Sequence, residues 1–367
     1  KTLAVMLDVG TNNQDLQNDI LYLGEKHNRL AGEEFYEMVE EFVGAVTARW
    51  PKVLIQFEDF TNDHAFPLLD RYRKRVLCFN DDIQGTGAVA LAGILSALRV
   101  TDEPLSKQRF VFLGAGSAAV GIADMIVSGL VEEGLSPEEA RKQFWLIDSK
   151  GLVLKSRTDE LAEHKIPYAQ SGDLTGSLLE VVRQVKPTVL IGVSKQAGSF
   201  SEEVIKEMQS HVSRPMIMAL SNPTSKSECT AEQAFRWTAG KALFASGSPF
   251  SPVTLAGKVF VPGQGNNMYI FPGVGLGAIL CHASQVTNSM FYTAAKTLSE
   301  QVTFDELEVG KLYPDLKTIR DISAQIAVAV CEVAFEEKLA QIERPLDLLS
   351  FVKQRMFLPH YVPFKAV

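Results

Sequence analysis

A chain of 367 residues is long enough for two or more domains with a buried core. Hydrophobic residues make up 46% of it and charged residues 22%, which are ordinary values for a globular protein in water. The formal net charge of −8 argues against a nucleic-acid partner, because surfaces that bind the phosphate backbone are basic. The apolar stretches Ala88–Leu98 and Met268–Cys281 are too short or too rich in glycine to span a membrane, so no membrane partner is expected.

The cysteines and the chain start indicate the compartment and the extent of the chain. Cys78, Cys229, Cys281 and Cys331 lie far apart with no CxxC pair, which predicts free thiols in a reducing compartment. With no signal peptide in the sequence, we expect a cytoplasmic protein, and an organelle matrix is also compatible. The chain starts at Lys1 without an initiator Met and runs directly into apolar residues, as a trimmed chain does.

Apolar periodicity predicts the elements up to residue 100. The run Leu3–Leu7 is typical of a buried strand. Residues Glu33–Arg49 carry apolar side chains at helical spacing, which predicts an amphipathic helix. Val53–Phe57 and Val76–Phe79 are predicted as short strands, and the apolar segment Gly87–Val100 as a buried helix.

From residue 110 strands alternate with helices. The predicted strands are Phe110–Leu113, Phe144–Ile147, Thr188–Ile191 and Met216–Leu220, and the predicted helices are Ile122–Leu130, Leu178–Val185 and Glu202–Met208. This alternation predicts a parallel sheet covered by helices on both faces. Beyond Phe271 the chain is predicted to be mainly helical, at Leu276–Ser284, Met290–Gln301 and Ile319–Lys338, and the proline-punctuated end is expected to lie over the surface.

The expected fold class is α/β. A Rossmann-like, doubly wound parallel sheet is inserted in a second α/β domain, and the C-terminal part is helical. We expect residues 1–80 and 267–340 to form a metal and substrate domain, 81–266 to form the nucleotide-binding domain, and 341–367 to form a C-terminal extension.

A glycine-rich turn opens the predicted nucleotide domain. It follows a strand, opens a helix and has the spacing G-x-G-x-x-x-x-G. Its first glycine is suited to the tight turn and its second to close approach of a pyrophosphate, while small residues let the helix pack against the sheet. The candidate cofactor-binding residues here are Gly114, Ala115, Gly116, Ser117, Ala118, Ala119 and Gly121. The alternative is a purely structural turn.

An acid at the end of the next strand bears on the choice of cofactor. Asp148 is placed to hold a ribose 2′-hydroxyl, which favours NAD. Ser149 and Lys150 follow it directly and Lys165 comes later, and basic groups there suit the 2′-phosphate of NADP. The sequence favours NADP with NAD as the alternative, and ordinary surface lysines would explain the same pattern.

Two acidic pairs follow predicted buried strands. Glu58 and Asp59 end one strand, and Asp81 and Asp82 end the next. Neighbouring residues on a strand point to opposite faces, so Glu58 and Asp59 can share a ligand only where the chain turns. Converging carboxylates suit Mn²⁺ or Mg²⁺. Acids in such pairs are also common as surface groups or helix caps, but unpaired acids beside buried strands are costly.

Asparagines end two loops farther along the chain. Asn222 follows a predicted strand of the nucleotide sheet, at the end where ligands bind. Asn266 and Asn267 end the glycine-rich segment that begins at Pro262. These amides are candidates to bind a carboxylate or a carboxamide, although turn chemistry alone also explains asparagine beside proline and glycine.

Taken together, these stretches resemble the malic enzyme family. The matching segments are Leu7–Asn12, Ile55–Phe60, Phe79–Thr86, Gly114–Gly116, Ile147–Gly151, Leu220–Thr224, Ala245–Phe250 and Pro262–Asn267. They follow the family's order from near the start of the chain to about residue 270.

The resemblance implies roles for individual residues. Glu58, Asp59 and Asp82 would bind the divalent metal, and Asp81 would tune a neighbouring base. Asn222 and Asn267 would contact malate and the nicotinamide. Asn62 and Thr86 would line the cofactor site. In the expected domain arrangement, the Asp81–Asp82 pair lies on a hinge between the two domains. Family members usually form dimers or tetramers, so a homo-oligomer is expected of the complete protein.

The resemblance also implies a reaction. Malate is oxidised at its 2-hydroxyl by hydride transfer to the dinucleotide, loses CO₂ with the metal as Lewis acid, and is protonated at C3 to give pyruvate. In the family, the Lys, Tyr and Arg that act as base, acid and malate clamp precede the Leu-Asp-Val-Gly-Thr stretch. This chain has almost nothing there, so we expect it to bind metal and dinucleotide but to turn malate over poorly.

Two other functions share these features. A malolactic enzyme converts malate to lactate and CO₂ with the same motifs, and free reduced cofactor would not accumulate in its assay. A non-catalytic dinucleotide-binding or assembly module is the alternative of another class, favoured if the natural protein starts where this chain does.

Overall fold

The computed structural model describes residues 2–358, which fall into two compact units. Among the described residues, the smaller unit holds those up to Val53 together with residues 355–358, and the larger unit runs from Leu54 to Gln354. The expected boundaries near residues 80 and 267 both lie inside the larger unit. The compact units follow another division of the chain, and the expected domain assignment stays a prediction. The last residues of the expected 341–367 extension lie outside the described residues.

The smaller unit is built on one long helix. Helix α2 (Glu33–Arg49) has the bounds that its apolar periodicity predicts, and it buries Phe35, Val39 and Val43. A short helix, α1 (Gln14–Asn18), precedes it. The expected buried strand at Leu3–Leu7 is wrong, because Leu3 is 72% and Met6 89% exposed and no strand lies within residues 2–53. Strand conformation there would leave backbone groups without a neighbouring strand to pair with.

The larger unit is organised around a seven-stranded sheet with the order β11-β8-β7-β6-β3-β4-β5. All neighbours are parallel except β5, which runs antiparallel to β4. The expected parallel sheet is confirmed. Its strands are β3 (Phe110–Leu113), β4 (Phe144–Asp148), β5 (Gly151–Leu152), β6 (Val189–Gly192), β7 (Met216–Ala219), β8 (Leu243–Ser246) and β11 (Gly263–Gln264).

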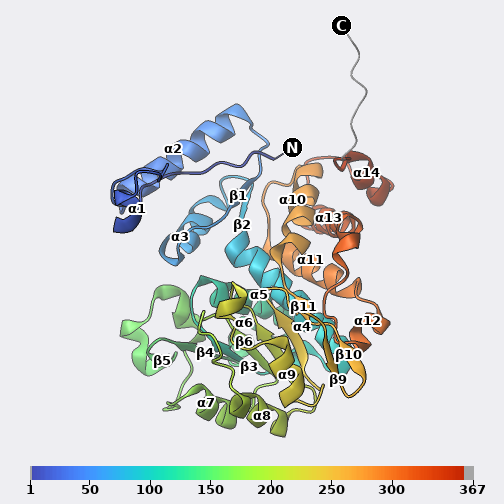
Figure 1. The fold of residues 1–367 in the computed structure, drawn as a ribbon. Helices are drawn as coiled ribbons and strands as arrows, with labels where there is room; N and C mark the ends of the chain where they lie inside the picture. Colours follow the sequence, from blue (N-terminus) through green and yellow to red (C-terminus); the bar gives the residue numbers. More distant parts are fainter. Residues whose placement is uncertain (1, 359–367) are drawn as a thin grey trace. The chain divides into compact units, whose positions relative to one another are not determined.

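Helices cover both faces of this sheet, as the strand sequences require. Phe110 and Phe112 of β3 belong to one apolar core and Val111 and Leu113 to another, because side chains alternate along a strand. The first face is covered by α4 (Thr86–Thr101) and α5 (Ser117–Glu132). Helix α11 (Asn288–Glu300) packs against these two, and α13 (Ile319–Glu336) and α10 (Phe271–Leu280) extend the same core beyond it. The other face is covered by α7 (Leu178–Val185), α8 (Glu202–His211) and α9 (Ala231–Trp237), seen at the bottom of Figure 1.

A short β-α-β unit precedes the large sheet. Strands β1 (Ile55–Phe57) and β2 (Cys78–Asn80) pair in parallel, and α3 (Asn62–Tyr72) connects them. A single π-helical turn, η1 (Asp81–Gly85), then leads directly into α4. Residues Asp81–Thr101 are long and apolar enough to span a membrane, but 78% of that window is buried inside the protein, as in a core helix.

The remaining elements are small and peripheral to the sheet. They are α6 (Pro137–Arg141), the hairpin of β9 (Val253–Leu255) and β10 (Lys258–Phe260), α12 (Phe304–Glu308) and α14 (Leu348–Arg355). Short 3₁₀ turns connect the larger elements within residues 2–358: η2 (Leu105–Lys107), η3 (Lys155–Glu160), η4 (Glu163–Tyr168), η5 (Thr224–Lys226), η6 (Asn267–Tyr269) and η7 (Leu316–Thr318).

At one place the strand order reverses, and a doubly wound sheet is expected to form a ligand crevice there. From β3 the chain proceeds to β4 on one side, and it then returns to β6 on the other side of β3. Loops leave the carboxyl ends of β3 and β6 in opposite directions there, and ligands of doubly wound sheets bind at such a switch point.

Candidate functional site

The glycine turn lies at this switch point, directly after β3. Gly114 has a φ of +119°, and a Cβ on it would lie 2.9 Å from the carbonyl oxygen of Val193, so both the conformation and the space require glycine. Gly116 is the N-cap residue of α5 and provides no side-chain cap. The N-terminus of a 16-residue helix without such a cap, next to backbone that approaches closely, is suited to an anion such as a pyrophosphate.

The later small residues of the turn serve packing. A Cβ on Gly121 would lie 2.6 Å from the carbonyl oxygen of Ile83 in η1, and Ala119 is fully buried. Glycine at position 121 therefore lets α5 lie directly against the turn that carries Asp81 and Asp82. This contact connects the nucleotide helix to the acidic segment.

Asp148 ends β4 as expected, but its carboxylate is already engaged. The Arg157 guanidinium donates to both of its oxygens at 3.0 and 3.1 Å, and Lys165 Nζ lies 3.3 Å from Oδ2. Burial acts to raise the pKa of Asp148, but hydrogen bonds from the Lys150 backbone and Arg157, with the Lys165 charge, outweigh it and lower the pKa. Two cations on one carboxylate leave a net positive charge at this strand end.

The two residues that follow Asp148 do not bond its carboxylate through their side chains. Ser149 and Lys150 are exposed, and Lys150 Nζ pairs with Glu160 at 3.1 Å instead of with Asp148. Lys165 is the one predicted lysine whose ammonium lies at Asp148. Arg157 was missed by sequence reasoning, since nothing in its spacing from Asp148 distinguishes it from a surface arginine.

Three acids converge where β1 and β2 end. Glu58 and Asp59 follow β1, and Asp59 turns the chain with a φ of +60°, a conformation that Asp tolerates better than most residues. Its backbone N–H donates to Asp82 Oδ2 at 2.8 Å. One carboxylate oxygen from each of Glu58, Asp59 and Asp82 lies within 4.8 Å of the others. The turn predicted to be necessary for sharing a ligand is present.

Negative charge in this cluster is poorly compensated. Burial, with Glu58 and Asp59 nearby, raises the pKa of Asp82 to about 6. Burial also raises the pKa of Asp81 to about 7, against the opposing hydrogen bond from Asn267, with Glu58 and Asp82 adding to the rise. Asp81 is 2% exposed, and its Oδ1 has no hydrogen-bond partner among the described residues. Hard oxygen donors carrying this unbalanced charge fit a divalent cation such as Mn²⁺ or Mg²⁺.

Glycine is required beside Asp81 as well. A Cβ on Gly85 would overlap Asp81 Oδ1, so the carboxylate occupies the space that any other residue's side chain would need. The π-helical geometry of η1 places residues 81 and 85 together in this way. Gly85 is a site residue that the glycine pattern at residue 114 did not reveal.

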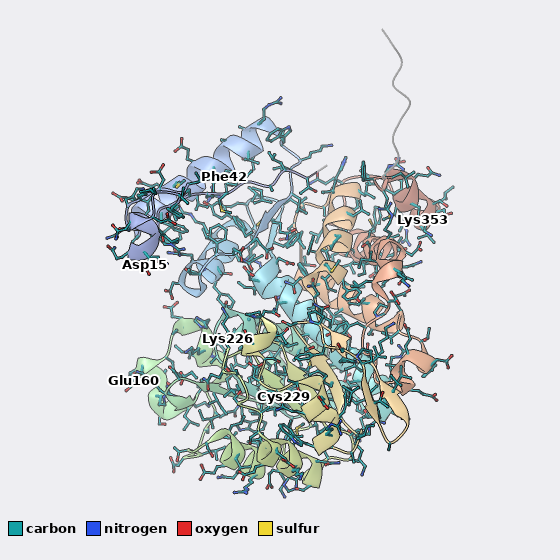
Figure 2. The ribbon with its side chains drawn as sticks, viewed as in Figure 1. Asp15, Phe42, Glu160, Lys226, Cys229 and Lys353 are labelled. Carbon is teal, nitrogen blue, oxygen red and sulfur yellow. The ribbon has the colours of Figure 1, made fainter. Side chains whose placement is uncertain are left out.

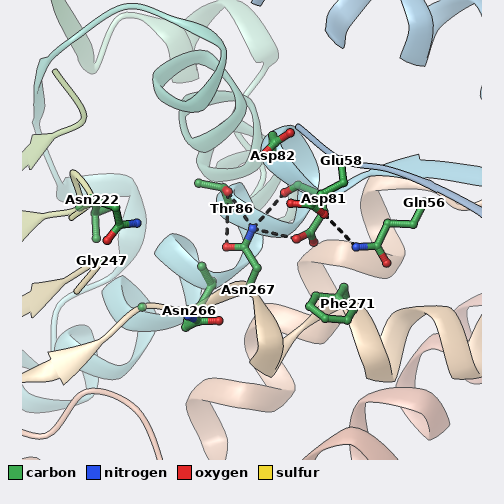
Figure 3. Close-up of a pocket in the computed structure, with 13 residues that line it drawn as sticks. Gln56, Glu58, Asp81, Asp82, Thr86, Asn222, Gly247, Asn266, Asn267 and Phe271 are labelled. Carbon is green, nitrogen blue, oxygen red and sulfur yellow. Dashed lines mark hydrogen bonds between the residues drawn. The ribbon is translucent and has the colours of Figure 1, made fainter. Parts of the chain in front are cut away.

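Asn267 connects the acidic segment to the loop that follows β11. Its Nδ2 donates to Asp81 Oδ2 at 2.9 Å and to Thr86 Oγ1 at 3.0 Å (Figure 3). Asn267 and Thr86 are separated by 181 positions in the sequence, and only the fold brings them together. The amide fixes the orientation of the Asp81 carboxylate.

A cavity of about 470 Å³ lies between these groups and the strand ends of the sheet. Asn222 lines it and accepts a hydrogen bond from Ser248 Oγ at 2.7 Å through Oδ1. Asn266 also lines it, while its Oδ1 accepts from Met268 N. Lining residues that sequence reasoning did not select are Gln56, Val89, Leu220, Gly247, Gly265 and Phe271. Gln56 donates to Glu58 Oε2 at 3.0 Å and so orients a candidate metal ligand.

The structure brings seven of the predicted site residues together around this cavity. Glu58, Asp81, Asp82, Thr86 and the three asparagines Asn222, Asn266 and Asn267 line the cavity, while the glycine turn and Asp148 lie outside its lining. Asn62 is the first residue of α3, and its side chain lies outside the described residues.

Family profiles cover most of the chain. The profile described as "Malic enzyme, NAD binding domain" matches residues 83–335, and "Malic enzyme, N-terminal domain" matches residues 1–73. The two matches meet close to the acidic cluster. The boundary between them differs from that of the compact units.

Individual relatives agree with the profiles. An NADP-dependent malic enzyme from Dictyostelium discoideum is 55% identical over 98% of this chain and 67% of its own length. A mitochondrial NADP-dependent malic enzyme from Mus musculus is 50% identical over 99% of this chain and 60% of its own. The crystal structure of Entamoeba histolytica malic enzyme has the same fold, with a TM-score of 0.71 at 24% identity over 87% of this chain and 61% of that one. The chain thus spans about two thirds or less of the length of these proteins.

Proposed function

Because the chain belongs to the malic enzyme family, we propose that it provides the metal, dinucleotide and part of the malate site for the oxidative decarboxylation of malate to pyruvate and CO₂ with reduction of NADP⁺. The observation that carries this proposal is the convergence of Glu58, Asp59 and Asp82 beside a cavity lined by Asp81, Asn222 and Asn267. Metal donors and groups that bind carboxylates then face one substrate-sized space.

The carboxylates of Glu58, Asp59 and Asp82 would hold the cation. When bound there, a divalent cation supplies Lewis-acid polarisation of the oxygens of malate. The backbone of Asp59 donates to Asp82, and Gln56 donates to Glu58, so two of the three ligands are oriented by hydrogen bonds before any cation binds. Such orientation reduces the reorganisation that binding requires.

Asp81 would orient the group that takes the substrate proton, and the asparagines would bind the substrate or the nicotinamide. Asn267 holds Asp81 Oδ2, while the buried Oδ1 is left to accept a hydrogen bond from the group that removes the malate hydroxyl proton. Ser248 engages Asn222 Oδ1, which leaves Asn222 Nδ2 to donate to a substrate carboxylate or a nicotinamide carboxamide.

NADP⁺ supplies the hydride acceptor of the proposed reaction. The glycine turn and the N-terminus of α5 would hold its pyrophosphate, and Lys165 would face its 2′-phosphate. Support for NADP over NAD comes from Asp148, since its carboxylate is paired with Arg157 and Lys165 and so is not a vacant acceptor for a ribose 2′-hydroxyl. We also propose a homo-oligomer of this family's kind for the complete protein, in the cytoplasm or an organelle matrix; one of the relatives is named as mitochondrial.

Binding measurements on the chain test this proposal. We expect one Mn²⁺ to bind, detected by loss of the free-ion electron paramagnetic resonance signal, and NADPH to bind, detected by its fluorescence. Asp82→Asn should weaken Mn²⁺ binding by about a hundredfold, because it removes a charged ligand. Asp70→Asn is the matched control, since Asp70 is an exposed acid on α3 outside the cluster.

The outcomes are distinct. Equal Mn²⁺ affinity in the wild type and Asp82→Asn would place the metal elsewhere and refute the site. Slow malate-dependent accumulation of free NADPH supports oxidative decarboxylation, whereas lactate formation without free NADPH would contradict it and indicate malolactic chemistry.

A further inference from the structure

One buried acid has no part in the function proposed above. Glu228 is fully buried, on the segment between η5 and α9 that Lys226 and Cys229 mark in Figure 2. A carboxylate taken out of water destabilises a protein unless several donors satisfy it. The surroundings of Glu228 supply those donors, and all of them come from two loops at the carboxyl end of the sheet.

The first loop follows β6. Ser194 donates its backbone N–H to Glu228 Oε1 at 3.1 Å. Gly192, the last residue of β6, leaves room for the acid, since a Cβ there would overlap the Glu228 side chain. The carboxylate thus lies against the end of the strand that borders the switch point.

The second loop follows β7. Ser221 donates its Oγ–H to Glu228 Oε1 at 2.5 Å and its backbone N–H to Oε2 at 3.4 Å. Ser221 Oγ in turn accepts from the backbone N–H of Lys195 at 2.8 Å. Lys195 has a φ of +58°, a conformation that is unfavourable for a long side chain and needs such support. One carboxylate therefore connects the two loops directly and through Ser221.

Both loops border places where ligands are expected. The carbonyl oxygen of Val193, next to Ser194, lies against Gly114 of the glycine turn, where a Cβ would come within 2.9 Å of it. Asn222, next to Ser221, lines the cavity. A shift of either loop would change the width of the crevice at the glycine turn or the direction of the Asn222 amide.

We propose that Glu228 is a positioning residue for the dinucleotide: its carboxylate fixes the Val193–Lys195 loop against the glycine turn and the Ser221–Asn222 loop beside the cavity. This inference rests on the proposed function, because it assumes that the crevice binds NADP⁺. Glu228 acts through these loops and need not touch the cofactor. The metal ligands belong to other elements, so the effect on the metal should be small.

Glu228→Gln is the informative variant. It preserves size but replaces one acceptor oxygen with an NH₂ group, so one of the backbone N–H donors then faces another donor. We expect the dissociation constant for NADPH, measured by fluorescence on the whole chain, to rise about tenfold, and that for Mn²⁺ to stay within about twofold. If Glu228 only stabilised the fold, the variant would instead raise the dissociation constants for NADPH and for Mn²⁺ together.

Thr238→Val is the matched control. Thr238 is also fully buried, donates to Ala234 O at 2.7 Å and accepts from Ala242 N at 3.0 Å, but it lies at the far end of α9. Its loss should lower stability without changing the affinity for NADPH. If Glu228→Gln does not fold, Ser221→Ala is the milder variant, because it removes only the Ser221 hydroxyl between the two loops. It should weaken the binding of NADPH by at least about threefold.

The results separate the possible failures. Folded Glu228→Gln or Ser221→Ala protein with wild-type affinity for NADPH would overturn the positioning role and leave the proposed function intact. Equal loss of affinity for Mn²⁺ and for NADPH would also overturn the positioning role and would indicate that Glu228 stabilises the protein as a whole. A wild-type chain that binds Mn²⁺ but no NADPH would overturn the proposed function and this inference with it.

Discussion

At the scale of single residues, the charged groups around Asp148 decide more than their order in the sequence suggests. Lys150 is adjacent to Asp148 but pairs with the exposed Glu160, whereas Lys165 reaches the carboxylate from a separate 3₁₀ turn. Arg157 satisfies both carboxylate oxygens. The positive charge at this strand end therefore depends on two residues that are 9 and 17 positions away from Asp148.

This arrangement predicts which lysine selects the cofactor. Lys165→Gln should weaken the binding of NADPH about tenfold and leave the affinity for NADH within about twofold of the wild type. Only NADPH carries the 2′-phosphate that the lost charge would bind. Lys150→Gln, at the exposed neighbour, should change neither. The measurement is a pair of fluorescence titrations for each variant. A loss of NADPH affinity in Lys150→Gln alone would show that the sequence neighbour, and not the spatial one, faces the phosphate.

At the scale of elements, close helix packing connects the two halves of the site. Glycines on α4 and α5 let backbone lie against backbone: a Cβ on Gly87 would lie 2.6 Å from Gly121 O, and one on Gly121 equally close to Ile83 O. The nucleotide helix therefore lies directly against the π-helical turn that carries Asp81 and Asp82. Backbone atoms cannot move aside as a flexible side chain can, so these contacts are sensitive to one added methyl group.

Gly121→Ala tests that packing. We expect it to destabilise the protein by about 1–3 kcal/mol through overpacking, and to weaken NADPH because α5 must move. Gly275→Ala is the control: it is also a helical glycine, but a Cβ there meets nothing within 4 Å, so it should be neutral or stabilise by up to about 1 kcal/mol. Urea unfolding of both variants provides the measurement. Equal stabilities would contradict the close contact between α5 and η1.

At the scale of the whole molecule, the acidic cluster makes stability depend on pH and on metal. Asp82 and Asp81 have pKa values of about 6 and about 7 in the folded chain, mainly because they are buried. The pKa of an Asp in the unfolded chain is about 3.9. The folded state therefore binds more protons than the unfolded state between these values, and stability falls as the pH rises through that window.

We therefore expect the free energy of unfolding of the metal-free chain to decrease from pH 5 to pH 8, as measured by urea titration in a chelator. Saturating Mn²⁺ should raise stability most at the upper end and remove much of this decrease, because a cation favours the ionised carboxylates. Asp81→Asn should also reduce the decrease. A pH dependence that neither Mn²⁺ nor Asp81→Asn alters would mean that other groups control it.

Local patterns of apolar residues were enough to predict several elements. Helix α2, strand β3 and helix α7 have the predicted bounds, because apolar spacing reports which face is buried. The alternation of strands and helices predicted the parallel sheet. The glycine turn and both acidic pairs were identified because each directly follows a buried strand. The family resemblance assigned Glu58, Asp59 and Asp82 to one metal, and their convergence needed only that two parallel strands end side by side.

Tertiary structure decided what depends on partners far away in the chain. The apolar run at Leu3–Leu7 has the composition of a strand, but residues 2–53 contain no strand that could pair with it. β8 and β11 were not predicted, because β11 has only two residues and β8 reads Leu-Phe-Ala-Ser, without the unbroken run of large apolar side chains that identifies β3. The pairing of Arg157 with Asp148, the space for Asp81 over Gly85, and the burial of Glu228 between two loops likewise have no local signal. Each is fixed by contacts that form only once the sheet has brought its loops together.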